Sequence, residues 1–113
     1  MSTKRVLDFE KLIVAGDMNA SITTDGSNIL YTDRVGYQIK WTGVPVGSFT
    51  VEISNDETTW VELTLSTAIT AAGSADEAFI DAETAAKFIR LKYTRTSGTG
   101  TLNVHITAKS ISA

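Results

Sequence analysis

One histidine and a set of acidic side chains are the residues best suited to chemistry in this sequence. His105 alternates with the apolar residues Val104 and Ile106, which predicts that it lies on the polar side of a strand. Its imidazole could titrate near neutral pH. The chain has no cysteine and a single histidine, so no thiolate or second imidazole can complete a catalytic dyad or a zinc-ligand set. We therefore interpret His105 as a solvated strand histidine.

Carboxylates are the other candidates, because their oxygens could hold Ca²⁺. The candidate oxygen ligands are the acids Asp76, Glu77, Asp81 and Glu83, and in the turns Asp25, Asn28, Asn55, Asp56 and Glu57. Neither set has the one-three-five ligand spacing of a calcium loop, so both are interpreted as solvated acidic loops. A glycosidase needs only two carboxyl groups at the right separation, and the sequence selects no such pair. We therefore expect no metal and no cofactor, assign no catalytic residue, and predict a protein that is not an enzyme.

The glycines near the C-terminal end form the third candidate. Gly98 and Gly100 could be mistaken for a loop that cradles a phosphate, but such loops join a strand to a helix. Here the flanking segments both have strand patterning. The sequence predicts a β-hairpin turn in which the glycines supply positive φ angles.

Aromatic and basic residues could form binding surfaces of two further kinds. Trp41 and Trp60 could form a platform on which sugars stack, although their strand context favours packing in the core or at a sheet edge. Arg90, Lys92 and Arg95 place positive charge on one strand and its end. These cations are expected to pair with acids on a neighbouring strand or subunit.

Composition limits the classes of partner. Among 113 residues, Lys+Arg 10 against Asp+Glu 13 gives a net charge of −3, which argues against nucleic-acid binding and against anionic membranes. Apolar runs such as Leu12–Ala15 are far shorter than the roughly 20 residues that span a bilayer. No export signal is recognised, so we expect synthesis in a cytoplasm. The length fits a single domain over residues 1–113.

The elements that must position these residues are β-strands. Apolar and polar residues alternate repeatedly from about Ile29 to Ala108, and segment 101–108 is the most regular. The residues predicted to face inward in the other segments are Tyr37, Ile39, Trp41, Phe49, Val51, Ile53, Val61, Leu63, Leu65, Ile89, Leu91 and Tyr93. Turn signals separate the segments, and Pro45 falls in one of them.

Two regions leave alternatives open. Residues 67–86 are predicted to be a loop crossing between sheets with a short strand at 78–80, or to contain a helical turn. Residues 1–24 are predicted to be an N-terminal arm or edge strands. Seven or eight short strands bury their apolar faces most simply in two packed sheets. The predicted fold is all-β, a single-domain antiparallel β-sandwich of jelly-roll or Greek-key type.

Three segments together resemble a group of small proteins of tailed phages and prophages. They are residues 36–49, 54–60 and 87–104, and the stretch from 36 to 104 over which they are spread is somewhat less than two-thirds of the chain. The resemblance implies a head decoration or tail-associated virion protein that works by self-association and by docking on other virion proteins. Glu57 stands where a glycine commonly follows the aspartate in that group, so a different turn geometry is expected there.

Segment 54–60 and the strand at 88–91 are also similar to part of the discoidin-type, galactose-binding-like sandwich. The leading hypothesis is a non-enzymatic virion structural protein, assembled in the host cytoplasm, that forms a homo-oligomer through sheet edges or its N-terminal arm. The alternative is a carbohydrate-binding module that recognises a surface glycan through exposed aromatics and loop acids.

Overall fold

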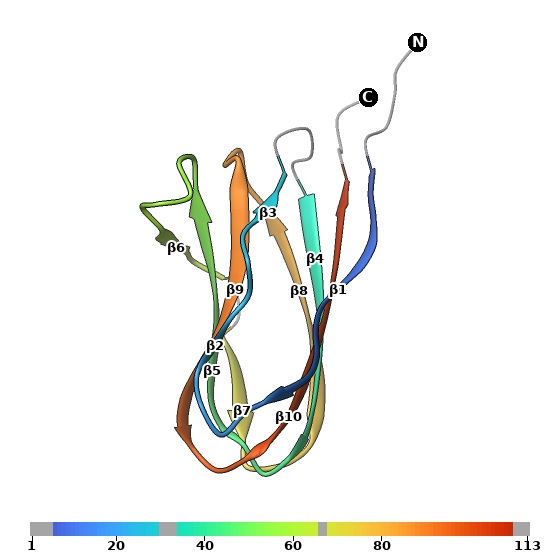
Figure 1. Cartoon of the computed structure of the whole chain (residues 1–113), viewed down its shortest axis with the longest axis vertical. Coiled ribbons are helices and arrows are strands. Elements are labelled where there is room, and N and C mark those ends of the chain that lie inside the picture. The colour runs from blue at the N-terminus through green and yellow to red at the C-terminus, as the bar shows by residue number, and fades with distance from the viewer. Residues whose placement is uncertain (1–5, 30–33, 66–67, 110–113) are drawn as a thin grey trace.

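The computed structural model describes residues 6–29, 34–65 and 68–109, and the regular structure in these ranges is entirely β (Figure 1). The strands are β1 (Val6–Asp17), β2 (Ile22–Thr23), β3 (Ser27–Asn28), β4 (Arg34–Gly43), β5 (Val46–Ser54), β6 (Val61–Leu63), β7 (Ile69–Ala72), β8 (Asp76–Glu83), β9 (Phe88–Ser97) and β10 (Gly100–Lys109). Within these ranges no helix is long and apolar enough to cross a membrane.

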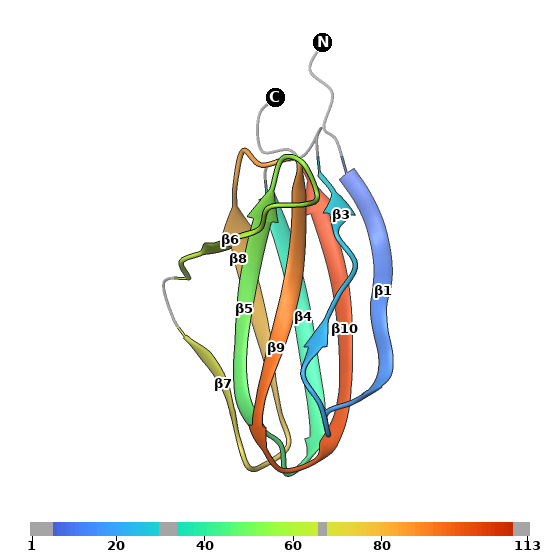
Figure 2. The same cartoon turned by 60° about the vertical axis from the view of Figure 1, so that its left-hand side comes forward.

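The strands form two antiparallel sheets that pack face to face (Figures 1 and 2). Sheet A has the order β1-β10-β4-β8, and sheet B has the order β2-β9-β5-β6. In sheet B, β3 pairs with β9 and β7 pairs with β5, so β2 with β3 and β6 with β7 each form one interrupted edge. Counting each interrupted edge as one strand gives eight strands, and all connections except the one from β5 to β6 pass between sheets. This is a jelly roll, which confirms the predicted all-β sandwich.

The core lies between the sheets and is built by the predicted alternation. Tyr37, Ile39 and Trp41 of β4 are buried, and so are the inward residues of β5, β9 and β10. The Trp41 ring lies 5.2 Å from that of Phe49, measured between centroids, and Phe49 lies 5.0 Å from Tyr93. The Trp41 Nε1–H donates to the carbonyl oxygen of Ser74 at 2.9 Å. These contacts join the two sheets, because β4 belongs to sheet A while β5 and β9 belong to sheet B.

Both open regions of the sequence form strands. Residues 6–17 and 22–23 form the edge strands β1 and β2, while residues 1–5 lie outside the described ranges. The predicted strand at 78–80 is the centre of the longer strand β8. Within the described residues of 67–86, β7 and β8 replace the helical turn, because both segments find hydrogen-bonding partners in a neighbouring strand.

The connection containing Gly98 is not the predicted hairpin. It joins β9 of sheet B to β10 of sheet A, at the end of the sandwich drawn lowest in Figure 1. Gly98 has the expected positive φ of +76°, whereas Gly100 does not. A Cβ at Gly100 would instead lie 2.2 Å from the carbonyl oxygen of Thr42. Gly98 therefore lets the β9–β10 connection approach the β4–β5 connection at Val44, and Gly100 lets β10 approach its neighbour β4 within sheet A. A sequence pattern cannot distinguish this arrangement from a hairpin.

The prediction for Val61 is also wrong. Val61 was expected to face inward with Leu63 and Leu65, but its side chain is 60% exposed. Strand β6 covers only Val61–Leu63 and pairs with the last part of β5, so the strand is too short to continue the alternation. Leu63 and Leu65 pack against the edge of the core.

Candidate binding surface

Among the described side chains, Phe79 is the most exposed aromatic residue on the outer face of sheet A. It lies on β8 and is 64% exposed, because Ala78, Ile80 and Ala82 take the inward positions of that strand. Its ring extends across Gly36 of the neighbouring strand β4. A Cβ at Gly36 would lie 2.6 Å from the Phe79 Cζ atom. The glycine therefore leaves room for the tip of the ring above β4, among the polar outward residues of β4 and β8.

In the described part of the chain, three hollows border this ring, and two of them are lined by residues of sheet A alone. The first, of about 380 Å³, is lined by Arg34, Gly36, Phe79, Asp81 and Thr107. The second, of about 250 Å³, is lined by Gln38, Glu77, Ala78 and Phe79. Each hollow thus combines one side of the ring with groups that donate or accept hydrogen bonds, which is the combination that fixes the orientation of a bound molecule.

Charged residues on this face are arranged by strand. Arg34 of β4 forms a two-pronged contact with Asp81 of β8, with Nε–Oδ1 at 2.9 Å and Nη2–Oδ2 at 2.5 Å. The hydrogen bonds that the Arg34 guanidinium donates to Asp81, and then the negative charge of Asp81, raise the pKa of Arg34. Glu83 lies 3.9 Å from Arg34 Nη1. At the other end of the face, exposed Lys40 of β4 is opposite exposed Glu77 of β8 in the strand register.

A second polar region lies at the opposite end of the sandwich from Gly98, in the loop after β5. The Ser54 hydroxyl donates to Asp56 Oδ1 at 2.8 Å, and the backbone N–H groups of Thr58 and Thr59 donate to the same oxygen, each at 2.8 Å. These bonds, with that of Thr59 the strongest, lower the pKa of Asp56 to about 2. The ionised Asp56 carboxylate therefore stabilises the loop, and its Oδ1 atom already accepts three hydrogen bonds from residues of the same loop.

The two tryptophans occupy structural positions, as the packing interpretation predicted. Trp41 is buried in the core. Trp60 is half-buried, and the Arg90 guanidinium carbon lies 4.1 Å from the centroid of its ring. Arg90 Nε also donates to Glu52 Oε1 on the adjacent strand β5 at 2.7 Å. The predicted cross-strand ion pair is thus confirmed for Arg90, and its side chain covers the one ring that the loop could have offered to a ligand.

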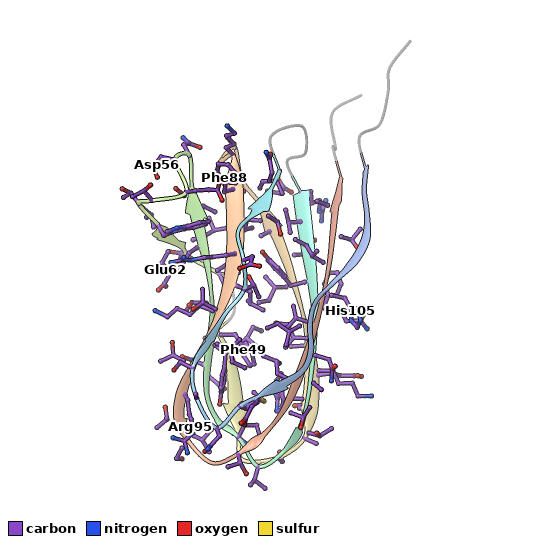
Figure 3. The ribbon with its side chains drawn as sticks, in the orientation of Figure 1. Phe49, Asp56, Glu62, Phe88, Arg95 and His105 are labelled. Atoms are coloured by element: carbon purple, nitrogen blue, oxygen red, sulfur yellow. The ribbon has the colours of Figure 1, made fainter. Side chains whose placement is uncertain are left out.

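The other candidate residues are placed as follows. His105 points outward from β10, away from Phe49 in the core, as its alternation predicted (Figure 3). Arg95 Nε donates to the carbonyl oxygen of Gly98 at 3.0 Å, so it stabilises the crossing connection. Ser27 and Asn28, next to the predicted turn acid Asp25, form the short strand β3.

The acidic candidates are spread along strands and loops. Glu77, Asp81 and Glu83 follow one another on the outer side of β8, where alternate residues are about 7 Å apart. Across the described residues, no group of three or more acidic, histidine or cysteine side chains is placed to hold a metal ion. The structure therefore brings Asp81 to Arg34, and it does not gather the acids into one ligand set.

Phe79 is the residue that the sequence analysis missed. The strand at 78–80 was predicted, and alternation within it places Phe79 opposite in direction to Ala78 and Ile80. That pattern contained the signal for an outward ring. The glycine beneath the ring could not be inferred, because Gly36 and Phe79 are far apart in sequence and become neighbours only through the pairing of β4 with β8.

Comparisons of sequence identify no relative. No protein-family model matches the chain, and no curated protein matches it significantly. Solved structures do match its fold. The PBSX exported protein XepA superposes on 94% of this chain with a TM-score of 0.62 at 11% identity, and this chain spans only 36% of its length. The SPBc2 prophage-derived protein YomS has a TM-score of 0.56 at 10% identity, with 97% of each chain covered.

A carbohydrate-binding module has the same type of fold. The CBM22-1 and GH10 modules of the Clostridium thermocellum xylanase 10B, solved with xylohexaose, match 97% of this chain and 27% of that chain, with a TM-score of 0.51 at 15% identity. At these identities the likeness concerns the fold. The chain is thus a β-sandwich of a type that occurs both in prophage proteins and in carbohydrate-binding modules.

Proposed function

We propose that this chain is a non-enzymatic structural protein of a phage particle, acting by self-association and by docking on other virion proteins. The observation that carries the proposal is the match to the prophage-derived protein YomS, which covers 97% of both chains. This match supports the proposal because it shows that a jelly roll of this size occurs in a prophage-derived protein. The match to XepA adds a second prophage protein with this fold.

The surface chemistry is compatible with this role. Asp81 and Glu52 form ion pairs with arginines, and Asp56 accepts hydrogen bonds within its own loop. The outer faces of the two sheets are extended surfaces to which a partner protein could bind. Extended faces suit contacts between proteins better than they suit the conversion of a small substrate. We place the protein in the virion after assembly in the host cytoplasm, as a head decoration or tail-associated component.

The test is the composition of purified particles. A phage or induced prophage that encodes this chain is purified by density gradient, and the chain is quantified by mass spectrometry against a major capsid protein. A fixed, stoichiometric amount in intact particles is expected. Its absence from particles, together with abundance in the lysate, would contradict a virion role.

Carbohydrate binding is the second candidate, because Phe79 presents an exposed ring between two polar hollows. A ring held in this way can contact the apolar face of a sugar while neighbouring polar groups bind its hydroxyls. Glycan-array binding is measured for the wild type, for Phe79→Ala, and for Val61→Ala as a matched control at an exposed apolar residue on the other sheet. Saturable binding that only Phe79→Ala abolishes would support this candidate, and a blank array would count against it.

A further inference from the structure

The outer face formed by β4 and β8 carries two stripes of opposite charge on either side of an exposed ring. We call it the Phe79 face, and it comprises Arg34, Gly36, Gln38 and Lys40 on β4 and Glu77, Phe79, Asp81 and Glu83 on β8. The charges on β4 are positive and those on β8 are negative. Because the strands are antiparallel neighbours, each cation of one stripe lies across from an acid of the other: Arg34 from Glu83 and Lys40 from Glu77.

The ring alone identifies no partner, since single exposed apolar side chains are common on protein surfaces. The charges around the ring point to a second copy of the chain as the partner, because the face carries both signs of charge and is complementary to itself in one orientation only. A two-fold contact places the same surface of both copies together. Three orientations of the two-fold axis are available to a flat sheet, and the stripes distinguish them.

An axis along the sheet normal would pair the edge strand β8 with β8 of a second copy. An antiparallel pairing centred on Phe79 would then place Glu77 opposite Asp81 of the second copy, which is unfavourable for like charges. An axis in the plane of the face but perpendicular to the strands would place β4 over β4 and β8 over β8. Lys40 would then face Arg34 of the second copy, again with like charges opposed.

The third axis lies between β4 and β8 and runs parallel to them. Rotation about it places β4 of each copy over β8 of the other and keeps the position along the strands unchanged. Lys40 then faces Glu77 of the second copy, and Arg34 faces Glu83. Packed sheets lie about 10 Å apart, a gap that the long side chains of lysine and glutamate can bridge from opposite sides.

The same axis brings the two aromatic rings together. Phe79 leans from β8 toward Gly36 on β4, so its ring lies between the strands, where the axis passes. We infer that two copies of this chain associate face to face through the Phe79 face, about a two-fold axis parallel to β4 and β8, with the Phe79 rings at the centre. The inference rests on the self-association in the proposed function and assigns it a surface and a symmetry.

The test uses two charge reversals that should each prevent association yet restore it when mixed. In Lys40→Glu, two acids oppose each other in both copies of the contact between positions 40 and 77, and in Glu77→Lys two lysines do. Each change occurs twice in a symmetric dimer, so we expect each variant alone to have a dissociation constant at least about tenfold higher than that of the wild type. When the two variants are mixed in equal amounts, a dimer of one Lys40→Glu chain and one Glu77→Lys chain has opposite charges at both contacts between positions 40 and 77. We therefore expect this heterodimer to form.

Masses are measured by sedimentation velocity at low ionic strength, where surface charges are least screened. Lys92→Glu, on β9 of the other sheet, is the matched control and should remain dimeric. Phe79→Ser should dissociate the dimer, and thermal unfolding of every variant verifies that it is folded. Neither variant contains both changes, so a dimer that forms only on mixing must result from a contact between two chains and not from a contact within one chain.

Two results would overturn the inference: a monomeric wild type, or a dimer whose affinity neither Lys40→Glu nor Glu77→Lys alters. If the Phe79 face binds a glycan and not a second copy, the wild type will be a monomer and its binding on the glycan array will depend on Phe79. None of these results would decide the virion role, because the presence of the chain in purified particles is measured separately.

Discussion

At the scale of single residues, Glu57 has an unusual backbone conformation in the loop after β5. The resemblance to small phage proteins, in which glycine is common at this position, predicted a different turn geometry. Glu57 has a φ of +61°, in the left-handed region that glycine adopts without strain. The hydrogen bonds around Asp56 hold the loop in this conformation, and the Glu57 N–H donates to Ser54 Oγ at 3.0 Å. The backbone at Glu57 thus has a conformation suited to glycine, and the glutamate there is strained.

This strain leads to a prediction. Glu57→Gly should raise the free energy of unfolding by about 0.5–1 kcal/mol, because relief of the left-handed strain exceeds the added flexibility of the unfolded chain. Glu57→Ala is the control, since it removes the same carboxylate but keeps a Cβ, and it should not be stabilised. Urea denaturation measures both variants. Equal stabilisation by alanine and glycine would show that the carboxylate, and not the φ angle, is responsible.

The depressed pKa of Asp56 predicts a pH dependence. Its folded pKa of about 2 lies below the ordinary aspartate value of 3.8, so the ionised form stabilises the fold above pH 3.8 and this contribution is lost as the pH falls toward 2. The melting temperature of the wild type should therefore fall more steeply between pH 4 and pH 2 than that of Asp56→Asn. Carboxyl-carbon NMR of Asp56 gives the pKa directly. A midpoint near 4 would disprove the hydrogen-bonded geometry.

At the scale of elements, the connections between sheets depend on glycines at positive φ. Gly98 and Gly73 have similar values, +76° and +85°, but different surroundings. A Cβ at Gly98 would lie 2.1 Å from the carbonyl oxygen of Val44, whereas at Gly73 the nearest atom is Val46 Cγ2 at 3.8 Å. One glycine is thus required both for its conformation and for close approach of two backbones, and the other for conformation only.

The two alanine variants separate these effects. Gly73→Ala should destabilise the fold by about 1–2 kcal/mol through backbone strain alone. Gly98→Ala should cost about 1–3 kcal/mol more, because its methyl group overlaps backbone that cannot rotate away. Chemical denaturation with a common slope gives both values. Equal losses would mean that the β4–β5 and β9–β10 connections can move apart at little cost.

At the scale of the whole molecule, one continuous core joins the two sheets. Trp41 of sheet A contacts Phe49 of sheet B, which in turn contacts Tyr93 of the same sheet. Inward residues of β10 and β8 complete the same cluster. Neither sheet could therefore keep its apolar face covered after the other unfolded, which favours a cooperative transition.

Two single-tryptophan variants test this cooperativity. Trp60→Phe leaves the core Trp41 as the only tryptophan, and Trp41→Phe leaves Trp60 in the loop after β5. Within each variant, the fluorescence midpoint should equal the midpoint of far-ultraviolet circular dichroism. A loop transition well below the global one in Trp41→Phe would indicate that this end of the sandwich unfolds separately.

The sequence by itself determined the class of fold and the direction of most side chains. In segments such as 37–41, 89–93 and 101–108, the period of two assigns each residue to the core or to solvent, because side chains alternate along any extended strand whatever its neighbours. The inward sets of β4, β9 and β10 follow from this rule, as does the outward position of His105. It failed at Val61, where the strand is too short to maintain the pattern.

Only the tertiary structure decided which strands are neighbours. Whether Gly98 closes a hairpin or crosses between sheets depends on which strand β10 pairs with, and its partners β1 and β4 are distant in sequence. The contact of Phe79 with Gly36 and the opposed charges of Lys40 and Glu77 arise in the same way, from the pairing of β4 with β8. Alternation is a local property of the backbone, but a binding face is made by long-range pairing, so the candidate surface could be recognised only in the folded chain.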